Sequence, residues 1–507
     1  MPGSKLFISY KRSIPTDERL AHAMRDAFMA LGHDVFIDVT MTAGTDWVAE
    51  IDRRIRWCDY LIVLLSEAAA ESEMVQAEVR LAHQGRRRDG RPNILPVRVN
   101  YTGSLGYELD AYLSRIQYVG WKGDADTAEV IAALQASISG KGKGEFKPSS
   151  SLDELASAVV SNPVADSRRP RASEDPRVLL PPGGTIKIDD AFYVRRDADG
   201  HIDKIAPGTG RTLVIKAARQ MGKSSLLIRY LAECKRAQKQ FAFIDFQSFS
   251  EAELVDLPAL LRRIAQILLR AFGLPKEPEL NFPNQLDFTN FVEDRILRAF
   301  GAPVAIAMDE VDRLLGRPYQ TDFFSMLRHW HNERAQPMSA WENMDLAMVI
   351  ATEPYLLIAT ADRSPFNVTP AIQLKPFGPL QLREINIAYG GPLTDNEQDQ
   401  LHELLAGHPY LTRLAFYWLV SSGSNFETMM ANSSDADGPF GEHLRSRMFM
   451  LQQQPDLLGA MRRVVSKGAE LNMDMFYRLH AAGLVERKGK TTIPANMLYA
   501  RFFRQLQ

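Results

Sequence analysis

The stretch that decides the fold is TLVIKAARQMGKSSLLIRYL, residues 212–231. It begins with an apolar run of strand length, passes through a turn that contains a glycine, and continues with the period of an amphipathic helix. A strand that feeds directly into a helix is the repeating unit of parallel α/β sheets. Similar apolar runs follow at FAFIDF (241–246), PVAIAMDE (303–310) and LAMVIAT (346–352). We therefore expect an α/β domain over residues 185–375.

The turn of this stretch has the residues of a phosphate-binding loop. In such a loop, backbone N–H groups at a helix N-terminus surround phosphates, a lysine reaches the outer phosphates, and a hydroxyl binds Mg²⁺. Lys223 and Ser224 fit the last two roles, and Ala217 stands where the motif usually has its first glycine. Alanine is tolerated there if its φ is not positive. The predicted nucleotide-binding loop consists of Gln220, Met221, Gly222, Lys223, Ser224 and Ser225.

A second motif supplies carboxylates for the same nucleotide. VAIAMDEVD (304–312) is an apolar strand that ends in Asp309 and Glu310. Asp309 is the expected Mg²⁺ ligand together with Ser224, and Glu310 is a candidate base for the attacking water. We expect ATP and Mg²⁺ as regulatory cofactors, and the motifs leave open whether ATP is hydrolysed, because a slow switch would use the same residues.

The first 140 residues have a strand-helix alternation of their own. Apolar runs at KLFIS (5–9), DVFID (34–38), DYLIVLLS (59–66) and NILPVRV (93–99) are separated by amphipathic stretches. This pattern predicts a doubly wound parallel sheet with its ligand site at the carboxyl ends of the strands. Residues 141–184, rich in Gly, Ser, Pro and charge, are expected to be a flexible linker.

The last third of the chain is predicted to be mainly helical. Residues 376–440 have the pattern of a helical lid, and residues 441–507 are helices followed by LVERKGKTTIPA (484–495), two short strands around a Lys-Gly turn. This order suggests a winged helix. Arg487, Lys488 and Lys490 at the turn would suit a phosphate backbone, but a charged hairpin tip is usually solvated, so nucleic-acid binding is kept only as an alternative.

One helix of the first domain has a charge in an unexpected place. In SEMVQAEVRLAH (72–83), Met74, Val75, Val79 and Ala82 form one apolar face, and Glu78 falls on the same stripe. An ionised carboxylate is costly to bury without a partner. A lone Glu of this kind usually lies at the solvated edge of the stripe, so the pattern alone does not assign a role.

Three segments of the first domain resemble the conserved boxes of Toll/interleukin-1 receptor (TIR) domains, which have a flavodoxin-like fold. They are KLFISYKRS, DVFIDVTMTAGTDWVAEI and CDYLIVLLS, and the resemblance spans residues 4–138. In bacterial TIR domains of this kind, the helix after the third strand carries a serine and a glutamate that Ser72 and Glu78 match, with Met74 where many relatives have Trp. The resemblance implies cleavage of the nicotinamide–ribose bond of NAD⁺, with Glu78 as the catalytic carboxylate.

The same resemblance implies the NAD⁺-binding residues. Those after the first strand are Ser9, Tyr10, Lys11 and Arg12, and those after the second are Asp38, Gly44 and Trp47. Lys11 or Arg12 would pair with the pyrophosphate, and Trp47 would stack on a ring. The alternative for Tyr10 and Trp47 is core packing, and for the two cations it is a solvated surface.

Three later segments resemble the STAND class of signalling NTPases, which are AAA-like switches. FYVRRD (192–197) corresponds to the adenine-side motif with Arg195, and MVIATEP (348–354) places Thr352 where a sensor residue stands, although Glu353 occupies the position of a frequent arginine. GHPYLTRLAFYWL (407–419) has Pro409 at the start of the lid helices and Arg413 as a phosphate sensor, or alternatively as a surface charge.

Composition adds limits to these expectations. The chain of 507 residues has a net charge of −2, two cysteines, and no apolar run of membrane-spanning or signal-peptide length, which favours a cytoplasmic protein without a membrane partner. The combined hypothesis is an NAD⁺ nucleosidase effector of prokaryotic immunity, controlled by ATP-dependent homo-oligomerisation through the NTPase and TIR domains. Without a sequence repeat of fixed period, we expect the trigger to be a separate protein. The alternatives are a non-enzymatic TIR scaffold and an ATP-dependent nucleic-acid-binding regulator.

Overall fold

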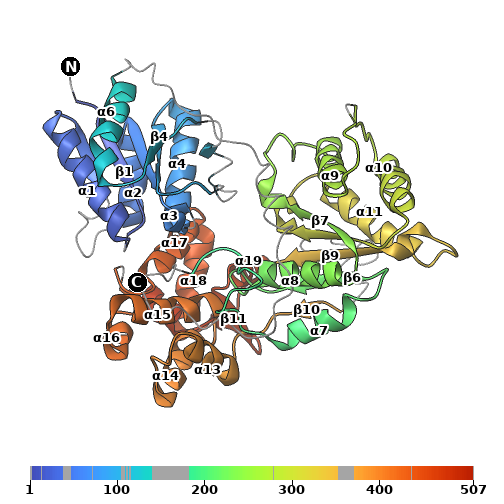
Figure 1. The fold of residues 1–507 in the computed structure, drawn as a ribbon. Coiled ribbons are helices and arrows are strands. Elements are labelled where there is room, and N and C mark those ends of the chain that lie inside the picture. Colours follow the sequence, from blue (N-terminus) through green and yellow to red (C-terminus); the bar gives the residue numbers. More distant parts are fainter. Residues whose placement is uncertain are drawn as a thin grey trace. The chain divides into compact units, whose positions relative to one another are not determined.

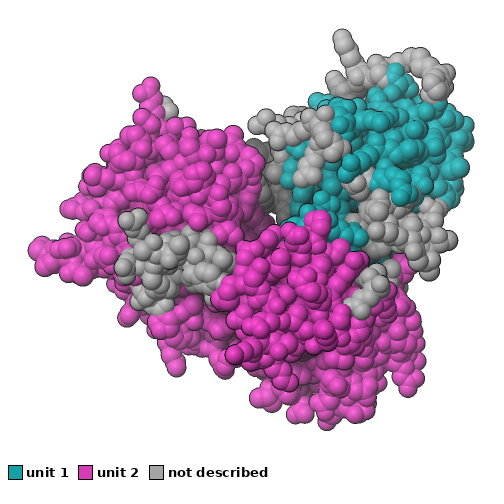
Figure 2. All heavy atoms as spheres, turned by 180° about the vertical axis from the view of Figure 1, so that it is seen from behind, with its two compact units in different colours: residues 1–169, 440–454 teal, residues 170–439, 455–507 magenta. Residues whose placement is uncertain are grey.

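The chain forms two compact units (Figure 2). The computed structural model describes residues 3–12, 14–37, 47–70, 72–103, 105, 109, 112–113, 116–139, 182–277, 279–351, 370–435 and 437–505. Unit 1 comprises Met1–Arg169 and Phe440–Gln454, and unit 2 comprises Pro170–Pro439 and Pro455–Gln507. Most of the linker expected at 141–184 lies outside the described residues.

Unit 1 is built on a five-stranded parallel sheet in the order β2-β1-β3-β4-β5. Its strands are β1 (Lys5–Ser9), β2 (Asp34–Ile37), β3 (Tyr60–Leu65), β4 (Asn93–Val99) and β5 (Val119–Trp121). This order is that of flavodoxin-like sheets, as expected. The first four strands coincide with the apolar runs of the sequence, whereas β5, an edge strand of three residues with a central glycine, has no such run.

Helices cover both faces of this sheet (Figure 1). Helices α1 (Pro15–Ala30) and α6 (Thr127–Ile138) pack on one face, and α2 (Trp47–Trp57) and α4 (Glu73–Asp89) on the other, with α3 (Glu67–Ala70) and the 3₁₀ turn η2 (Asp124–Asp126) in the connections. Side chains of β1 alternate between the faces, because successive residues of a strand point in opposite directions. The apolar stripe of α4 is buried as its period predicts.

A helix from late in the chain completes unit 1. Helix α17 (Gly441–Gln452) contacts α4 and α2. The sequence pattern groups residues 441–507 in one C-terminal segment, and within it α17 packs with unit 1 while the helices after it pack with unit 2. Helical periodicity shows that a helix has a face to bury, but it does not show which surface that face covers.

Unit 2 contains a second five-stranded parallel sheet, in the order β10-β6-β9-β8-β7. Its strands are β6 (Thr212–Lys216), β7 (Gln240–Asp245), β8 (Val304–Asp309), β9 (Met344–Ile350) and β10 (Ile372–Gln373). The first four coincide with the four apolar runs identified in the sequence. Strand β10 is too short to be recognised by its composition.

This sheet is also covered on both faces. Helices α7 (Asp197–Ile205) and α8 (Lys223–Arg236) pack on one face (Figure 1). The other face is covered by α9 (Leu257–Ala271), α10 (Gln285–Phe291), the π-helix η5 (Val292–Arg298) and α11 (Gln320–Glu333), and the 3₁₀ turns are η4 (Phe246–Ser248), η6 (Val311–Leu314) and η7 (Ala340–Asn343).

The rest of unit 2 is helical except for one hairpin. The helices are α13 (Pro379–Ala388), α14 (Asp395–Leu405), α15 (Pro409–Ser422), α16 (Phe426–Ala431), α18 (Pro455–Lys467), α19 (Met473–Ala481) and α20 (Met497–Arg504). Strands β11 (Val485–Lys488) and β12 (Thr491–Pro494) form the expected antiparallel hairpin. Within the described parts of the chain, no helix is both long and apolar enough to cross a membrane.

Candidate functional site

The carboxylate on the apolar stripe of α4 has a partner at the end of β1. The Ser9 hydroxyl donates a hydrogen bond of 2.5 Å to Oε2 of Glu78. Both residues are buried, Ser9 with 1% and Glu78 with 4% of its surface exposed. A hydrogen bond to an ionised acceptor is roughly twice as strong as a neutral one, so it offsets part of the cost of burying the charge.

The start of α4 determines where Glu78 lies. Ser72 is the N-cap of the helix, and its Oγ accepts a hydrogen bond from the Val75 amide at 3.3 Å. Val75 and Val79 then pack into the core between the sheet and α2. The cap and the apolar stripe together place Glu78 beside the carboxyl end of β1.

Two further groups join this edge of the sheet. Lys11, which follows β1, forms an ion pair with Glu442 of α17. The Ser72 hydroxyl donates a hydrogen bond of 2.7 Å to Oε1 of the same Glu442. The Lys11 side chain is 15% exposed and that of Glu442 is 28% exposed. Glu442 therefore bridges residues from both elements that carry the Ser9–Glu78 pair.

A buried acid that the sequence analysis did not single out supports the loop after β1. Asp17, in the first turn of α1, accepts a hydrogen bond of 2.6 Å from the Ser66 hydroxyl. Burial raises the pKa of Asp17 to about 6, although the Ser66 hydroxyl and Lys11 act in the opposite direction. The available signal was its position just after Pro15 at a helix start, where acids are common for structural reasons.

Of the other expected NAD⁺-site residues, the side chains of Tyr10 and Arg12 are described in the structure and those of three others are not. Tyr10 packs in the apolar cluster on the α1 and α6 face, opposite to the face that contains the α4 stripe. Arg12 is partly buried. Asp38 and Gly44 lie outside the described residues, as does the side chain of Trp47, the first residue of α2.

The second site is the loop between β6 and α8. Gly222 caps α8 with a φ of 89°, a conformation that favours glycine, and Ala217 does not have a positive φ, which is the condition for alanine at that position. Lys223 is buried, and its Nζ donates a hydrogen bond of 2.9 Å to the Ala218 carbonyl. Burial lowers the pKa of Lys223, and the nearby acids Glu310, Asp312 and Asp309 oppose that shift.

Carboxylates gather at the ends of the neighbouring strands. Asp309 ends β8 in register with Asp245, which ends β7. Burial raises the pKa of Asp309 to about 6; a hydrogen bond from Ser224 lowers it, and the charges of Glu310 and Asp245 raise it further. Burial is also the main reason that the pKa of Asp245 rises to about 6. A cation at this edge would relieve the like-charge repulsion.

The residues at this edge fit a magnesium ion that is bound together with phosphates. The Ser224 hydroxyl and the Asp309 carboxylate are adjacent oxygen donors, which Mg²⁺ prefers. In the described ranges, no group of three or more His, Cys, Asp or Glu side chains is arranged to hold a metal ion. The protein would therefore supply a minority of the ligands, as is usual for Mg²⁺ bound with a nucleotide.

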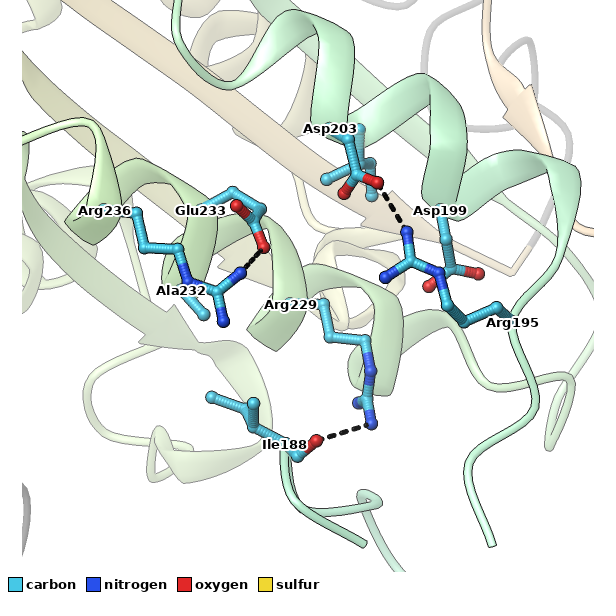
Figure 3. Close-up of a pocket in the computed structure, with 9 residues that line it drawn as sticks. Ile188, Arg195, Asp199, Asp203, Arg229, Ala232, Glu233 and Arg236 are labelled. Carbon is cyan, nitrogen blue, oxygen red and sulfur yellow. Dashed lines mark hydrogen bonds and ion pairs between the residues drawn. The ribbon is translucent and has the colours of Figure 1, made fainter. Parts of the chain in front are cut away.

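Arg195 and Arg196 point to different places. Arg195 donates a hydrogen bond of 2.5 Å to Asp203 and lines a pocket of about 120 Å³ between α7 and α8 (Figure 3). Arg229 and Arg236 of the same pocket are also engaged, with the Ile188 carbonyl and with Glu233 (Figure 3). The cations that line this pocket are thus already paired.

Arg196, not named from the sequence, is the one that contacts the phosphate loop. Its Nη1 donates a hydrogen bond of 2.8 Å to the Met221 carbonyl, and a Cβ atom on Gly222 would lie 2.9 Å from its Nη2. Burial lowers the pKa of Arg196, while Tyr193 and Asp199 favour its charged form. Two adjacent arginines in one motif gave no signal in the sequence for choosing between them.

The segment before α15 packs against Phe377, whose ring contacts Arg196 of this site. Gly407 has a φ of 67°, and a Cβ atom there would meet the Phe377 carbonyl oxygen at 2.0 Å. Pro409 follows as the first residue of α15. The Arg413 guanidinium lies 5.3 Å from the centre of the Phe192 ring, which packs against Tyr389. Thr352 lies outside the described residues.

The C-terminal segment of unit 2 also reaches the loop. The Arg219 amide donates a hydrogen bond of 3.1 Å to the Ala481 carbonyl at the end of α19. At the hairpin, the Arg487 guanidinium lies 4.2 Å from the centre of the Phe476 ring, whereas Lys488 and Lys490 are exposed. The α19 end is therefore in contact with the phosphate loop, and one of the three hairpin cations is held by an aromatic ring.

Comparisons with known proteins give two family matches. A family described as "AAA-like domain" matches residues 181–505, and one described as "TIR domain" matches residues 6–135. No curated protein matches the chain.

Among solved structures, the Walker-type ATPase of Pyrococcus abyssi is 16% identical, with a TM-score of 0.46 over 65% of this chain and 100% of that one. The STAND protein with a tetratricopeptide repeat sensor from Pyrococcus horikoshii is 15% identical, with a TM-score of 0.29 over 64% of this chain and 43% of that one. The TIR domains of the activated Roq1 resistosome are 14% identical, with a TM-score of 0.22 over 27% of this chain and 99% of that one. Because all three TM-scores are below 0.5, the assignment of the AAA-like and TIR regions rests on the two family matches.

Proposed function

The chain belongs to the AAA-like domain family and carries a TIR domain ahead of that region, and from this premise we propose that it cleaves NAD⁺ under the control of nucleotide binding. The TIR domain releases nicotinamide, and the AAA-like unit binds ATP with Mg²⁺ as a switch of the STAND kind. ATP-dependent homo-oligomerisation brings TIR domains together and turns the activity on. The cellular role that fits this chemistry is an effector of prokaryotic immunity.

The observation that carries this proposal is the buried pair of Ser9 and Glu78. An acid placed on a helix for packing alone would gain more from the solvated edge of the stripe than from a position with 4% exposure. Glu78 instead lies at the carboxyl end of β1, on the edge where flavodoxin-like sheets bind their ligands. A single ordered carboxylate at that place is the group that NAD⁺ cleavage requires.

The chemistry explains why one carboxylate is sufficient. Most glycosidases need a second carboxyl group that protonates the leaving group. In NAD⁺, the bond between ribose C1′ and the pyridinium nitrogen breaks, both electrons stay with the nitrogen, and nicotinamide leaves as a neutral molecule. Water then adds to C1′ and loses a proton, which gives ADP-ribose. The remaining task for the protein is to stabilise the positive charge that develops on the ribose.

Each residue of the TIR edge has a part in this step. Glu78 lies beside the ribose as an ionised carboxylate, and the hydrogen bond from Ser9 holds its Oε2 in one orientation. Lys11 pairs with the pyrophosphate, because an ammonium group favours anionic oxygens. The Asp17–Ser66 hydrogen bond supports the loop that carries Lys11.

The AAA-like unit supplies the control. Lys223 at the N-terminus of α8, with Ser224 and Asp309 for Mg²⁺, would hold the phosphates, and the bound ion would neutralise the charge of the neighbouring carboxylates. Arg196 and the end of α19 both contact the loop. A shift of the loop on phosphate binding would therefore move two segments, the one before β6 that carries Arg196 and the C-terminal one that carries α19.

The test is nicotinamide release by the purified full-length protein incubated with NAD⁺ and Mg–ATP. Glu78→Gln should lower the rate by about 100-fold or more, since the amide cannot stabilise a cation in the same way. Glu129→Gln, which removes an exposed acid of α6, is the matched control and should leave the rate unchanged. Undiminished release from Glu78→Gln would contradict the proposal, and a total absence of release from the oligomer would favour the scaffold alternative.

A further inference from the structure

Helix α17 carries an acid, Glu442, that contacts Lys11 and Ser72 next to the candidate NAD⁺ site. Within unit 1, α17 contacts α4 and α2, although it follows them by more than 350 residues in the chain. Its first turn carries Glu442, which pairs with Lys11 and accepts a hydrogen bond from Ser72 at 2.7 Å. This contact lies two residues from Ser9 on one element and six residues from Glu78 on the other.

The contact is of a kind that competes with a ligand. A carboxylate and a phosphate are alternative partners for the same ammonium and hydroxyl donors. While Glu442 holds Lys11 and Ser72, these donors are not available to the pyrophosphate of a dinucleotide. The pair is partly exposed, at 15% for Lys11 and 28% for Glu442, so a competing anion can reach it from solvent.

We infer that α17 is a built-in competitive inhibitor of the NAD⁺ site, with Glu442 occupying the position of the substrate's pyrophosphate. This inference rests on the proposed function and names how that site is regulated. The inhibitor is a segment of the same chain, and its removal is the step that an activating signal must bring about.

The connections of α17 explain how such a signal reaches it. The first segment of unit 2 runs to Pro439, two residues before the helix begins, and its second segment starts at Pro455, three residues after the helix ends. Both ends of the inhibitory helix are therefore joined covalently to the nucleotide-binding unit. A rearrangement of unit 2 between its nucleotide states would pull on α17 from both sides, which biases the bound and released positions of Glu442.

The experiment compares full-length wild type with Glu442→Gln, using initial rates of nicotinamide release over a range of NAD⁺ concentrations without ATP. We expect Glu442→Gln to lower KM about 5-fold or more with kcat nearly unchanged, since competition is relieved but the reacting groups are untouched. Glu442→Asp, which keeps the charge, and Glu129→Gln, which removes an exposed acid from α6, should both behave closer to wild type.

Hydrogen exchange of residues 441–452 gives a second readout that does not depend on NAD⁺ chemistry. The inference expects faster exchange in Glu442→Gln and in wild type with saturating NAD⁺. Measurable turnover with the same KM in wild type and Glu442→Gln would overturn the inference and leave NAD⁺ cleavage standing. No nicotinamide from any variant, even with Mg–ATP, would refute the proposed function itself and this inference with it, while the exchange data would still show whether α17 is held by Glu442.

Discussion

A carboxylate on an apolar helical face needs a partner, and Ser9 supplies one to Glu78 across 69 positions of sequence. The helical period of residues 72–83 was sufficient to predict the buried stripe and to mark Glu78 as an exception. It was not sufficient to identify the partner, because sequence periodicity has no information on which strand end a helix faces. The same limit applies to Glu442, Asp17 and Arg196, whose contacts come from distant elements.

Removing the partner should weaken both stability and chemistry. Ser9→Ala deletes the donor to a buried carboxylate, and we expect a loss of about 1–3 kcal/mol in the free energy of unfolding and roughly a 10-fold lower rate of nicotinamide release. Ser137→Ala, which deletes a hydroxyl that donates to the Ala133 carbonyl of its own helix, is the control. Urea unfolding and the nicotinamide assay check the two effects. Equal behaviour of both variants would mean that the Ser9–Glu78 bond contributes nothing.

The carboxylates of the nucleotide site predict a dependence on pH. The pKa of Asp309 is raised from 3.8 to about 6 in the folded protein, so ionising it there costs more than in the unfolded chain. The ligand-free protein therefore loses stability from this group as the pH rises from about 4 to 6. Asp309→Asn cannot ionise, and it should be more stable than wild type at pH 7.5, by about 3 kcal/mol as an upper limit.

Denaturant unfolding at several pH values, without nucleotide, measures this difference. The gap between Asp309→Asn and wild type should close toward pH 4, where both side chains are uncharged. Asp399→Asn on the exposed surface of α14 serves as control and should show no such trend. A gap that stays constant from pH 4 to 7.5 would show that Asp309 is not under this electrostatic strain.

At the scale of the elements, the strands and helices that could be predicted are those with an apolar run or a clear helical period in the sequence. Strands β1–β4 and β6–β9 coincide with the apolar runs of the sequence, and helices of two or more turns follow several of them, among them α1 after β1 and α8 after β6. Strands β5 and β10, of three and two residues, have no composition that separates them from loops. The position of α17 was not predictable, because its amphipathic face fits any apolar surface of matching shape.

The two glycines that flank α15 offer a test of how tightly this helix is connected to the phosphate loop. Gly407 and Gly423 flank α15 and both have positive φ, at 67° and 65°. An added Cβ at Gly423 meets no atom within 4 Å, whereas at Gly407 it meets the Phe377 oxygen at 2.0 Å. Gly423→Ala should cost about 1 kcal/mol of stability. Gly407→Ala should cost clearly more, because the Phe377 carbonyl must move as well.

Thermal unfolding and nucleotide affinity of the two glycine variants check this prediction. Phe377 also receives a cation–π contact from Arg196, which bonds the phosphate loop, so Gly407→Ala should weaken ATP binding and Gly423→Ala should not. Equal melting temperatures, or equal affinities, would show that the connection between α15 and the loop is not tight.

At the scale of the whole molecule, the account joins two nucleotide chemistries in one chain. The TIR domain holds the residues proposed for NAD⁺, and the AAA-like region holds those proposed for ATP. Lys223→Ala should abolish ATP binding, because it removes the cation that reaches the outer phosphates. Lys204→Ala, an exposed lysine of α7, is the control and should bind ATP normally. Light scattering with ATP should show oligomers for the control and not for Lys223→Ala; oligomers that form normally in Lys223→Ala would contradict the switch.

The measurement that tests the central claim most directly is the rate of nicotinamide release by the full-length protein, with and without Mg–ATP, in wild type and in Lys223→Ala. The account predicts that Mg–ATP raises the rate in wild type and has no effect in Lys223→Ala. A rate that is the same with and without ATP, or that rises equally in both proteins, would contradict the claim that the AAA-like unit controls the TIR domain.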